Sequence, residues 1–124
     1  MTSDDFRRIA LGLQGTVESS HMGHPDFRAH GRIFATLHTD SRWGMVKLAP
    51  RDQSRVIDEN PGTFAPESGA WGREGCTRVR LASVDDEVLG EAMTLAWRHA
   101  ADRSTSGRVR VRRSPARLKS VRRR

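Results

Sequence analysis

The sequence has little of three features that define other classes of protein. It contains one cysteine, Cys76, so neither an intrachain disulfide nor a CxxC redox pair can form. Its apolar runs stay far below the roughly 18 residues that span a membrane, and its first residues lack the basic and apolar segments of a signal peptide. We therefore expect a soluble protein in a reducing compartment, the cytoplasm.

Acidic residues are absent from the C-terminal part of the chain. All 15 Asp and Glu lie in residues 1–102 with 12 of the 22 Lys and Arg, which gives this segment a net charge of −3. The ten remaining basic residues give residues 103–124 a charge of +10. A chain of 124 residues can form one hydrophobic core. We predict one domain at 1–102 and a disordered Arg-rich tail at 103–124, because the tail has too few apolar residues to offset the cost of ordering.

Three helices are predicted from the spacing of the apolar residues. The first covers residues 4–13 with Ser3 at its N-cap, and the second covers 50–59 and begins with a proline. The third opens at Ser83 and continues to about residue 102, where a run of Ser, Thr and Gly residues is expected to end it.

Strands are predicted between these helices. Residues 17–48 form short runs broken by turn residues, which is typical of an antiparallel meander with a hairpin turn at 30–31. Alternation over 76–81 predicts a half-buried strand with arginines on its open side. Three glycines in 69–75 surround Trp71 and predict a loop or a bulged strand.

Five sequence blocks together resemble the MmcQ/YjbR family. They are SHMGHPDFR at 20–28, GRIFA at 31–35, WGMVKL at 43–48, GAWG at 69–72 and LAWR at 95–98. The resemblance covers residue 4 to about residue 100 and leaves out the tail. It implies an α+β, CyaY-like fold, in which the N- and C-terminal helices pack on one face of an antiparallel sheet. It also implies DNA binding through a double-wing arrangement of strand hairpins. Arg32 stands where the family often has lysine, which preserves the charge.

The first candidate site is a nucleic-acid interface made by the sheet and the tail. Guanidinium groups bridge phosphate oxygens, so basic residues along one sheet face can hold a nucleic-acid backbone. The residues proposed for this role are Arg28, Arg32, Lys47, Arg73, Arg78 and Arg80 in the domain, and Arg108, Arg110, Arg112 and Arg113 in the tail. The alternatives are an ordinary solvated sheet face, which the negative charge of the domain favours, and a tail without a selected function.

The second candidate site is a pocket formed by His24, Trp43 and Trp71, which would serve a protein or small-molecule partner. Most aromatic side chains of so small a domain are expected in its core. Trp71, which is flanked by glycines, is the exception: we expect it at the mouth of a groove, where it could stack on a nucleic-acid base.

Neither a metal site nor a catalytic site is predicted. The histidines at 21, 24, 30 and 38 and Asp26 include metal-ligating types, but the HxxHxD spacing matches no strong metal signature. The sequence also lacks the GxSxG, phosphate-loop and HExxH motifs. We therefore predict a non-enzymatic protein without a cofactor. Its predicted partner is nucleic acid, with DNA as the first candidate, bound with low sequence specificity.

Overall fold

The computed structural model describes the backbone of residues 1–38, 40 and 42–112. Among these residues, side chains are described as far as residue 103. In this part of the chain six strands form one antiparallel sheet in the order β1-β2-β3-β4-β6-β5. The strands are β1 (Val17–His21), β2 (His24–Ala29), β3 (Arg32–Leu37), β4 (Trp43–Lys47), β5 (Phe64–Pro66) and β6 (Cys76–Arg80). The predicted α+β class and the meander over residues 17–48 are confirmed.

Two tight turns connect the first three strands. The φ angles are 52° at Met22 and 82° at Gly23 in the first turn, and 57° at His30 and 74° at Gly31 in the second. Two consecutive residues with positive φ are typical of the type I′ turn, whose twist matches that of the strands it joins. The hairpin predicted at 30–31 is therefore confirmed.

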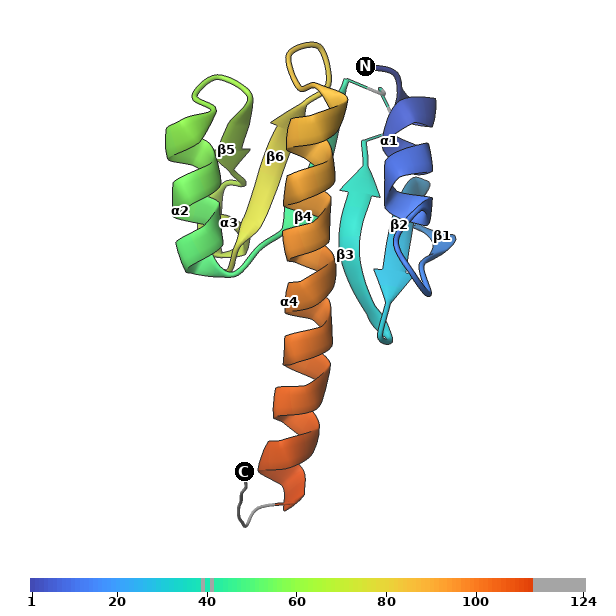
Figure 1. The fold of residues 1–124 in the computed structure, drawn as a ribbon, viewed down its shortest axis with the longest axis vertical. Coiled ribbons are helices and arrows are strands. Elements are labelled where there is room, and N and C mark those ends of the chain that lie inside the picture. Colours follow the sequence, from blue (N-terminus) through green and yellow to red (C-terminus); the bar gives the residue numbers. More distant parts are fainter. Residues whose placement is uncertain (39, 41, 113–124) are drawn as a thin grey trace.

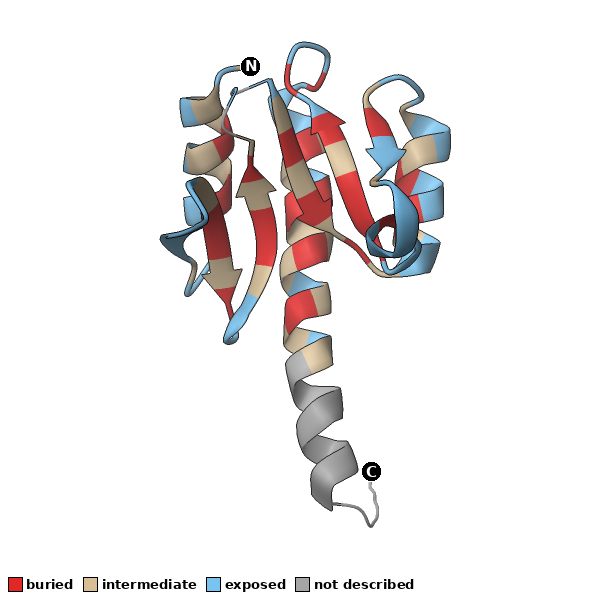
Figure 2. Cartoon of the chain, turned by 180° about the vertical axis from the view of Figure 1, so that it is seen from behind, coloured by how far each residue is buried: buried red, intermediate tan, exposed pale blue. Residues whose placement is uncertain are grey.

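The helices are α1 (Ser3–Leu11), α2 (Pro50–Glu59), α3 (Gly69–Arg73) and α4 (Asp86–Arg112). Figure 1 shows α1 and α4 in front of the same face of the sheet, as predicted for the N- and C-terminal helices. The opposite face, turned to the viewer in Figure 2, is called the open face below.

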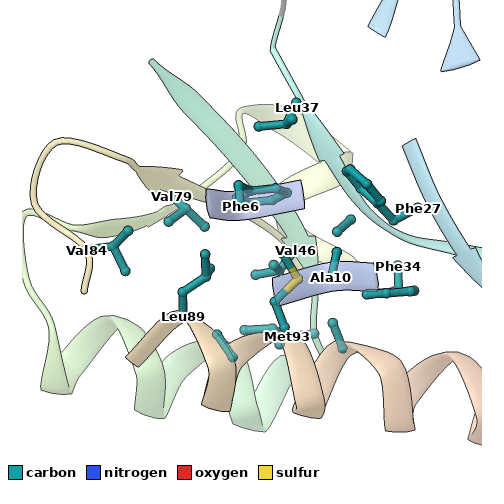
Figure 3. Close-up of a cluster of buried hydrophobic side chains, with 14 of the residues drawn as sticks. Phe6, Ala10, Phe27, Phe34, Leu37, Val46, Val79, Val84, Leu89 and Met93 are labelled. Atoms are coloured by element: carbon teal, nitrogen blue, oxygen red, sulfur yellow. The ribbon is translucent and has the colours of Figure 1, made fainter. Parts of the chain in front are cut away.

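The hydrophobic core lies between the sheet and these two helices. The side chains that meet there are fully buried: Phe6, Ala10, Phe27, Phe34, Val46, Leu89 and Met93 (Figure 3). Each buried large apolar side chain stabilises the fold by roughly 1.5–3 kcal/mol. Gly44 leaves room for this packing, because a Cβ atom at that position would overlap the ring of Phe6.

The first helix is capped one residue earlier than predicted. Thr2 Oγ1 accepts a hydrogen bond from the Asp5 N–H at 3.1 Å, and the Asp5 carboxylate accepts one from the Thr2 N–H at 3.0 Å. This reciprocal pair satisfies two backbone donors at once. Ser3 is therefore the first residue of α1 rather than its cap.

The last helix differs from its prediction at both ends. The Asp85 carboxylate accepts a hydrogen bond from the Val88 N–H at 2.8 Å, so Asp85 provides the cap expected from Ser83. The helix continues through residues 104–107 to Arg112, ten residues beyond the end predicted near residue 102. Ser, Thr and Gly cost a helix at most about 1 kcal/mol each relative to Ala, far less than proline does. Residues 113–124 of the predicted tail lie outside the described residues.

The third difference is α3, which stands where a loop or a bulged strand was predicted. Its five residues include two of the three glycines in that segment. Gly72 lies so close to the backbone of Glu67 that a Cβ atom would overlap the carbonyl oxygen of that residue. This close approach, rather than local helix propensity, explains why glycine is needed here.

Candidate nucleic-acid interface

The pairing of β4 with β6 decides which basic side chains reach the open face. Lys47 lies opposite Cys76, Met45 opposite Arg78 and Trp43 opposite Arg80, whereas the residues between them face the core. Because neighbouring residues of a strand point to opposite sides, the arginines of β6 share the open face with Lys47. This placement agrees with the strand predicted over 76–81.

A cavity of about 470 Å³ lies at one end of this face. We call it the basic cavity. It is lined by Arg28, Arg32, Lys47, Arg103, His21, Gly31, Ile33, Thr36, Met45, Trp71 and Cys76. Because β3 and β4 are antiparallel, Arg32 at the start of β3 and Lys47 at the end of β4 lie at the same end of the sheet. The extra turn of α4 adds Arg103 from the other side of the sheet.

The four cations of the basic cavity differ in how far they are neutralised. Arg28 donates two hydrogen bonds, of 2.9 and 3.2 Å, to the carboxylate of the fully buried Asp26. Lys47 lies 4.0 Å from the exposed carboxylate of Glu74, a distance at which little charge is neutralised in water. Among the ion pairs of the described residues, none includes Arg32 or Arg103.

The protonation equilibria around the cavity also indicate a concentration of positive charge. Partial burial, and after it the charge of Arg32, lowers the pKa of the Arg103 guanidinium. His99 lies nearby, and partial burial together with the charges of Arg103 and Lys47 lowers its pKa as well. Binding of an anion would relieve this repulsion between like charges. Burial raises the pKa of the Cys76 thiol, so this group is neutral and not a nucleophile at pH 7.

Trp71 projects from α3 at the edge of the basic cavity and is 71% exposed. The buried amide of Gln53 contacts the helix that carries Trp71. Gln53 Nε2 lies 3.0 Å from the Gly72 carbonyl oxygen, 3.3 Å from that of Cys76 and 3.2 Å from Thr77 Oγ1. The large exposed ring is therefore attached to a short helix with a fixed position.

The other end of the open face carries a second aromatic and basic cluster. The guanidinium carbons of Arg78 and Arg80 lie 4.4 and 4.8 Å from the ring centroid of Trp43. Arg78 Nε is also 3.8 Å from a carboxylate oxygen of Glu67, which partly neutralises its charge. A cavity of about 460 Å³ at this end is lined by Arg42, Trp43 and Arg80, among others.

The structure thus brings some of the predicted site residues together and separates others. Arg28, Arg32 and Lys47 line the basic cavity, while Arg78 and Arg80 lie farther along the open face. Arg73 is exposed on α3 without lining the cavity. Arg108, Arg110 and Arg112 belong to the extension of α4, and Arg113 lies outside the described residues.

The pocket predicted at His24, Trp43 and Trp71 is not a single site. Trp71 lines the basic cavity and Trp43 the cavity at the opposite end of the face. His24 instead faces His38, with 6.3 Å between the ring centroids. The two tryptophans therefore line separate cavities, and His24 lines neither of them.

Sequence reasoning missed Arg103 as a member of the site. The residue was assigned to the tail because the helix was expected to end before it. It continues the buried stripe of Ala96 and Ala100 at helical spacing, so extending that pattern by one more turn would have identified it.

The histidines considered as metal ligands are spread over the molecule. His24 is close to His38, but His30 packs against Trp97 at 4.8 Å between ring centroids. His21 lines the basic cavity. Within the described residues, no three His, Cys, Asp or Glu side chains are grouped so that they could hold a metal ion.

Fold and site together define a small α+β protein with a basic cavity on the open face of an antiparallel sheet. Residues 11–99 match the model of the YjbR family, and the chain belongs to that family. The resemblance found in the sequence blocks is therefore confirmed. Among the curated proteins, none matches the chain.

A solved structure with a similar fold is the crystal structure of the Deinococcus radiodurans protein DR2400, which carries a DUF419 domain. Its TM-score is 0.65 with 20% sequence identity, and the match covers 77% of this chain and 75% of that chain. At this identity the likeness shows the fold alone. None of the helices in the described residues is long and apolar enough to cross a membrane.

Proposed function

We propose that this protein binds DNA without catalysing a reaction on it, mainly by contacts to the phosphate backbone and with low sequence specificity. The observation that carries the proposal is the convergence of Arg32, Lys47 and Arg103 on one cavity. Neither arginine has a carboxylate partner among the described residues, and the lysine has only a distant one. Cationic side chains without a close carboxylate partner can bind phosphate oxygens.

The second support is the position of the α4 extension. Figure 1 shows α4 continuing past the end of the sheet at which β3 begins, which is also the end where Arg32 and Arg103 line the cavity. The sequence places further arginines along this extension and six more basic residues after it. A backbone bound at the cavity would therefore have additional cations nearby. The buried, unpaired thiol of Cys76 is in keeping with the reducing cytoplasm as the place of action.

The proposal is tested by the salt dependence of DNA affinity. Fluorescence anisotropy with a labelled duplex should give weaker binding for the variant carrying Arg32→Gln and Lys47→Gln. The slope of log K against log salt should become shallower by about 2, because each lost phosphate contact removes about 0.9 from it. The matched control is the variant Arg51→Gln with Arg55→Gln, which removes the same charge from exposed positions on α2. Equal slopes for the two variants would contradict a role for the cavity.

A small anionic ligand is the second candidate, and the volume of the basic cavity favours it. Ligand sites occupy about 300–1,000 Å³ and are mostly apolar with a few polar groups. The 470 Å³ cavity has the side chains of Ile33, Met45 and Cys76 among its lining. Binding of free mononucleotides or inorganic phosphate by a protein that binds no DNA would support this function instead.

A further inference from the structure

We propose that the basic cavity binds one unpaired nucleotide, with its base stacked on Trp71 and its phosphate held by Arg32, Lys47 and Arg103. The protein would then prefer single-stranded over duplex DNA. This inference rests on the proposed function and specifies the form of nucleic acid that the same site recognises.

Of the three tryptophans, Trp71 is the one with a free surface. Trp97 donates its indole N–H to the Gln14 carbonyl oxygen at 2.8 Å and is only partly exposed. Trp43 already contacts the guanidinium groups of Arg78 and Arg80. Trp71 is 71% exposed, so an incoming base can reach its ring without displacing a side chain. Stacking on such rings is the usual way in which proteins bind the bases of single strands.

The basic cavity has two chemical parts. Ile33, Met45 and the Trp71 ring provide apolar surface, whereas Arg32, Lys47 and Arg103 provide positive charge. An unpaired nucleotide has the same two parts, a base with apolar faces and an anionic phosphate. In a duplex the base faces are covered by stacking, so a duplex could use only the cationic part. A site for phosphates alone would have no use for the apolar surface.

The backbone that carries the stacking ring is held in place by contacts on α3. Gln53 donates to the Gly72 carbonyl oxygen at 3.0 Å, directly after Trp71 in the chain. The tight contact of Gly72 with the backbone of Glu67 fixes α3 on its other side. A ring whose backbone is held before binding has less conformational freedom to lose when it stacks, which increases affinity.

The deciding experiment compares a labelled 12-nucleotide single strand with its 12-base-pair duplex at one salt concentration. Trp71→Ala should weaken binding of the single strand about 5- to 150-fold, which corresponds to the roughly 1–3 kcal/mol lost when a stacking aromatic residue is replaced by alanine. Binding of the duplex should change less than about twofold, since it would use only the cations. Trp71→Phe should restore most of the single-strand affinity. The matched control is Met22→Ala, which removes an apolar side chain that is 85% exposed and lies outside the cavity lining.

Circular dichroism and the thermal unfolding midpoint verify that each variant is folded. If Trp71→Ala weakens both forms of DNA equally, or neither, the nucleotide site is wrong while backbone binding of DNA stands. If the unaltered protein binds neither form at low salt, the proposed function itself fails and this inference fails with it. A Trp71→Phe variant as weak as Trp71→Ala would also overturn stacking.

Discussion

At the scale of the residue, Gln53 connects the hydrophobic interior with the proposed site. Its amide is buried between α2, α3 and β6 and lies within hydrogen-bond distance of three acceptors, although it has only two N–H groups to share. One of these acceptors is the carbonyl oxygen of Gly72, next to the exposed Trp71. A polar residue inside the domain therefore determines where an apolar residue on its surface lies.

We expect Gln53→Leu to destabilise the protein by about 1–3 kcal/mol. The leucine has a similar volume but cannot donate the buried hydrogen bonds that the Gln53 amide offers. The carbonyl oxygens of Gly72 and Cys76 keep backbone N–H donors, so the expected loss is that of two hydrogen bonds, each with a net contribution of about 0.5–1.5 kcal/mol. Chemical denaturation measures the difference in the free energy of unfolding. The control is Ser54→Ala on the same helix, an exposed position where less than about 0.5 kcal/mol is expected. A change for Gln53→Leu as small as that of the control would show that the amide does not hold α3.

At the scale of the element, the features set by local chemistry could be predicted from the sequence. A proline opens the helix over 50–59, positive-φ residues turn the hairpin at 30–31, and alternation marks the strand over 76–81. Each of these patterns is complete within a few neighbouring residues. The structure of α3 cannot be predicted from such a local pattern. It depends on the close contact of Gly72 with Glu67 and on the hydrogen bond from Gln53, and neither can be seen in the neighbouring sequence.

Prediction from short local patterns also explains which residues of the candidate site were found and which one was missed. Arg32 and Lys47 could be found because the meander and its strand alternation place them on one face. Arg103 could not, since residues 104–107 were interpreted as helix breakers. In the structure they continue α4, and the arginine before them reaches the cavity.

The extension of α4 can be tested by interrupting it. Gly107→Pro should end the helix before residue 107 and reduce the helical signal in far-UV circular dichroism, because proline removes a backbone donor and costs a helix interior about 3 kcal/mol. The thermal midpoint should stay unchanged, since the extension passes beyond the sheet (Figure 1). Gly107→Ala serves as the control and should preserve or raise the helical signal. An unchanged spectrum for Gly107→Pro would contradict a helix that reaches Arg112.

At the scale of the whole molecule, net charge and local charge have opposite signs. Residues 1–102 carry a net charge of −3, yet the cations of the basic cavity gather at the end of the sheet from which α4 projects. The net charge of the whole chain, +7, therefore does not describe the domain, and the negative charge of the domain does not describe its site. For the proposed DNA binding we therefore expect two sources of affinity: a structured one at the cavity, and a purely electrostatic one in the C-terminal residues.

Removing residues 113–124 should separate these two sources. A chain that ends at Arg112 lacks six basic residues, and all of them lie outside the segment that matches the YjbR family. If each meets a phosphate, the slope of log K against log salt becomes shallower by about 5. Unfolding should be unaffected, because the core is formed by residues before this segment.

The discriminating measurement combines this shortened chain with Arg32→Gln. Arg32 is expected to contribute about 0.9 to the slope in the full chain and in the shortened one, because a fixed site in the cavity acts independently of the C-terminal residues. If the effect of Arg32→Gln disappears once residues 113–124 are removed, the cavity binds DNA only together with those residues. If it persists, the basic cavity is a binding site in its own right and the C-terminal residues add affinity without determining where the DNA lies.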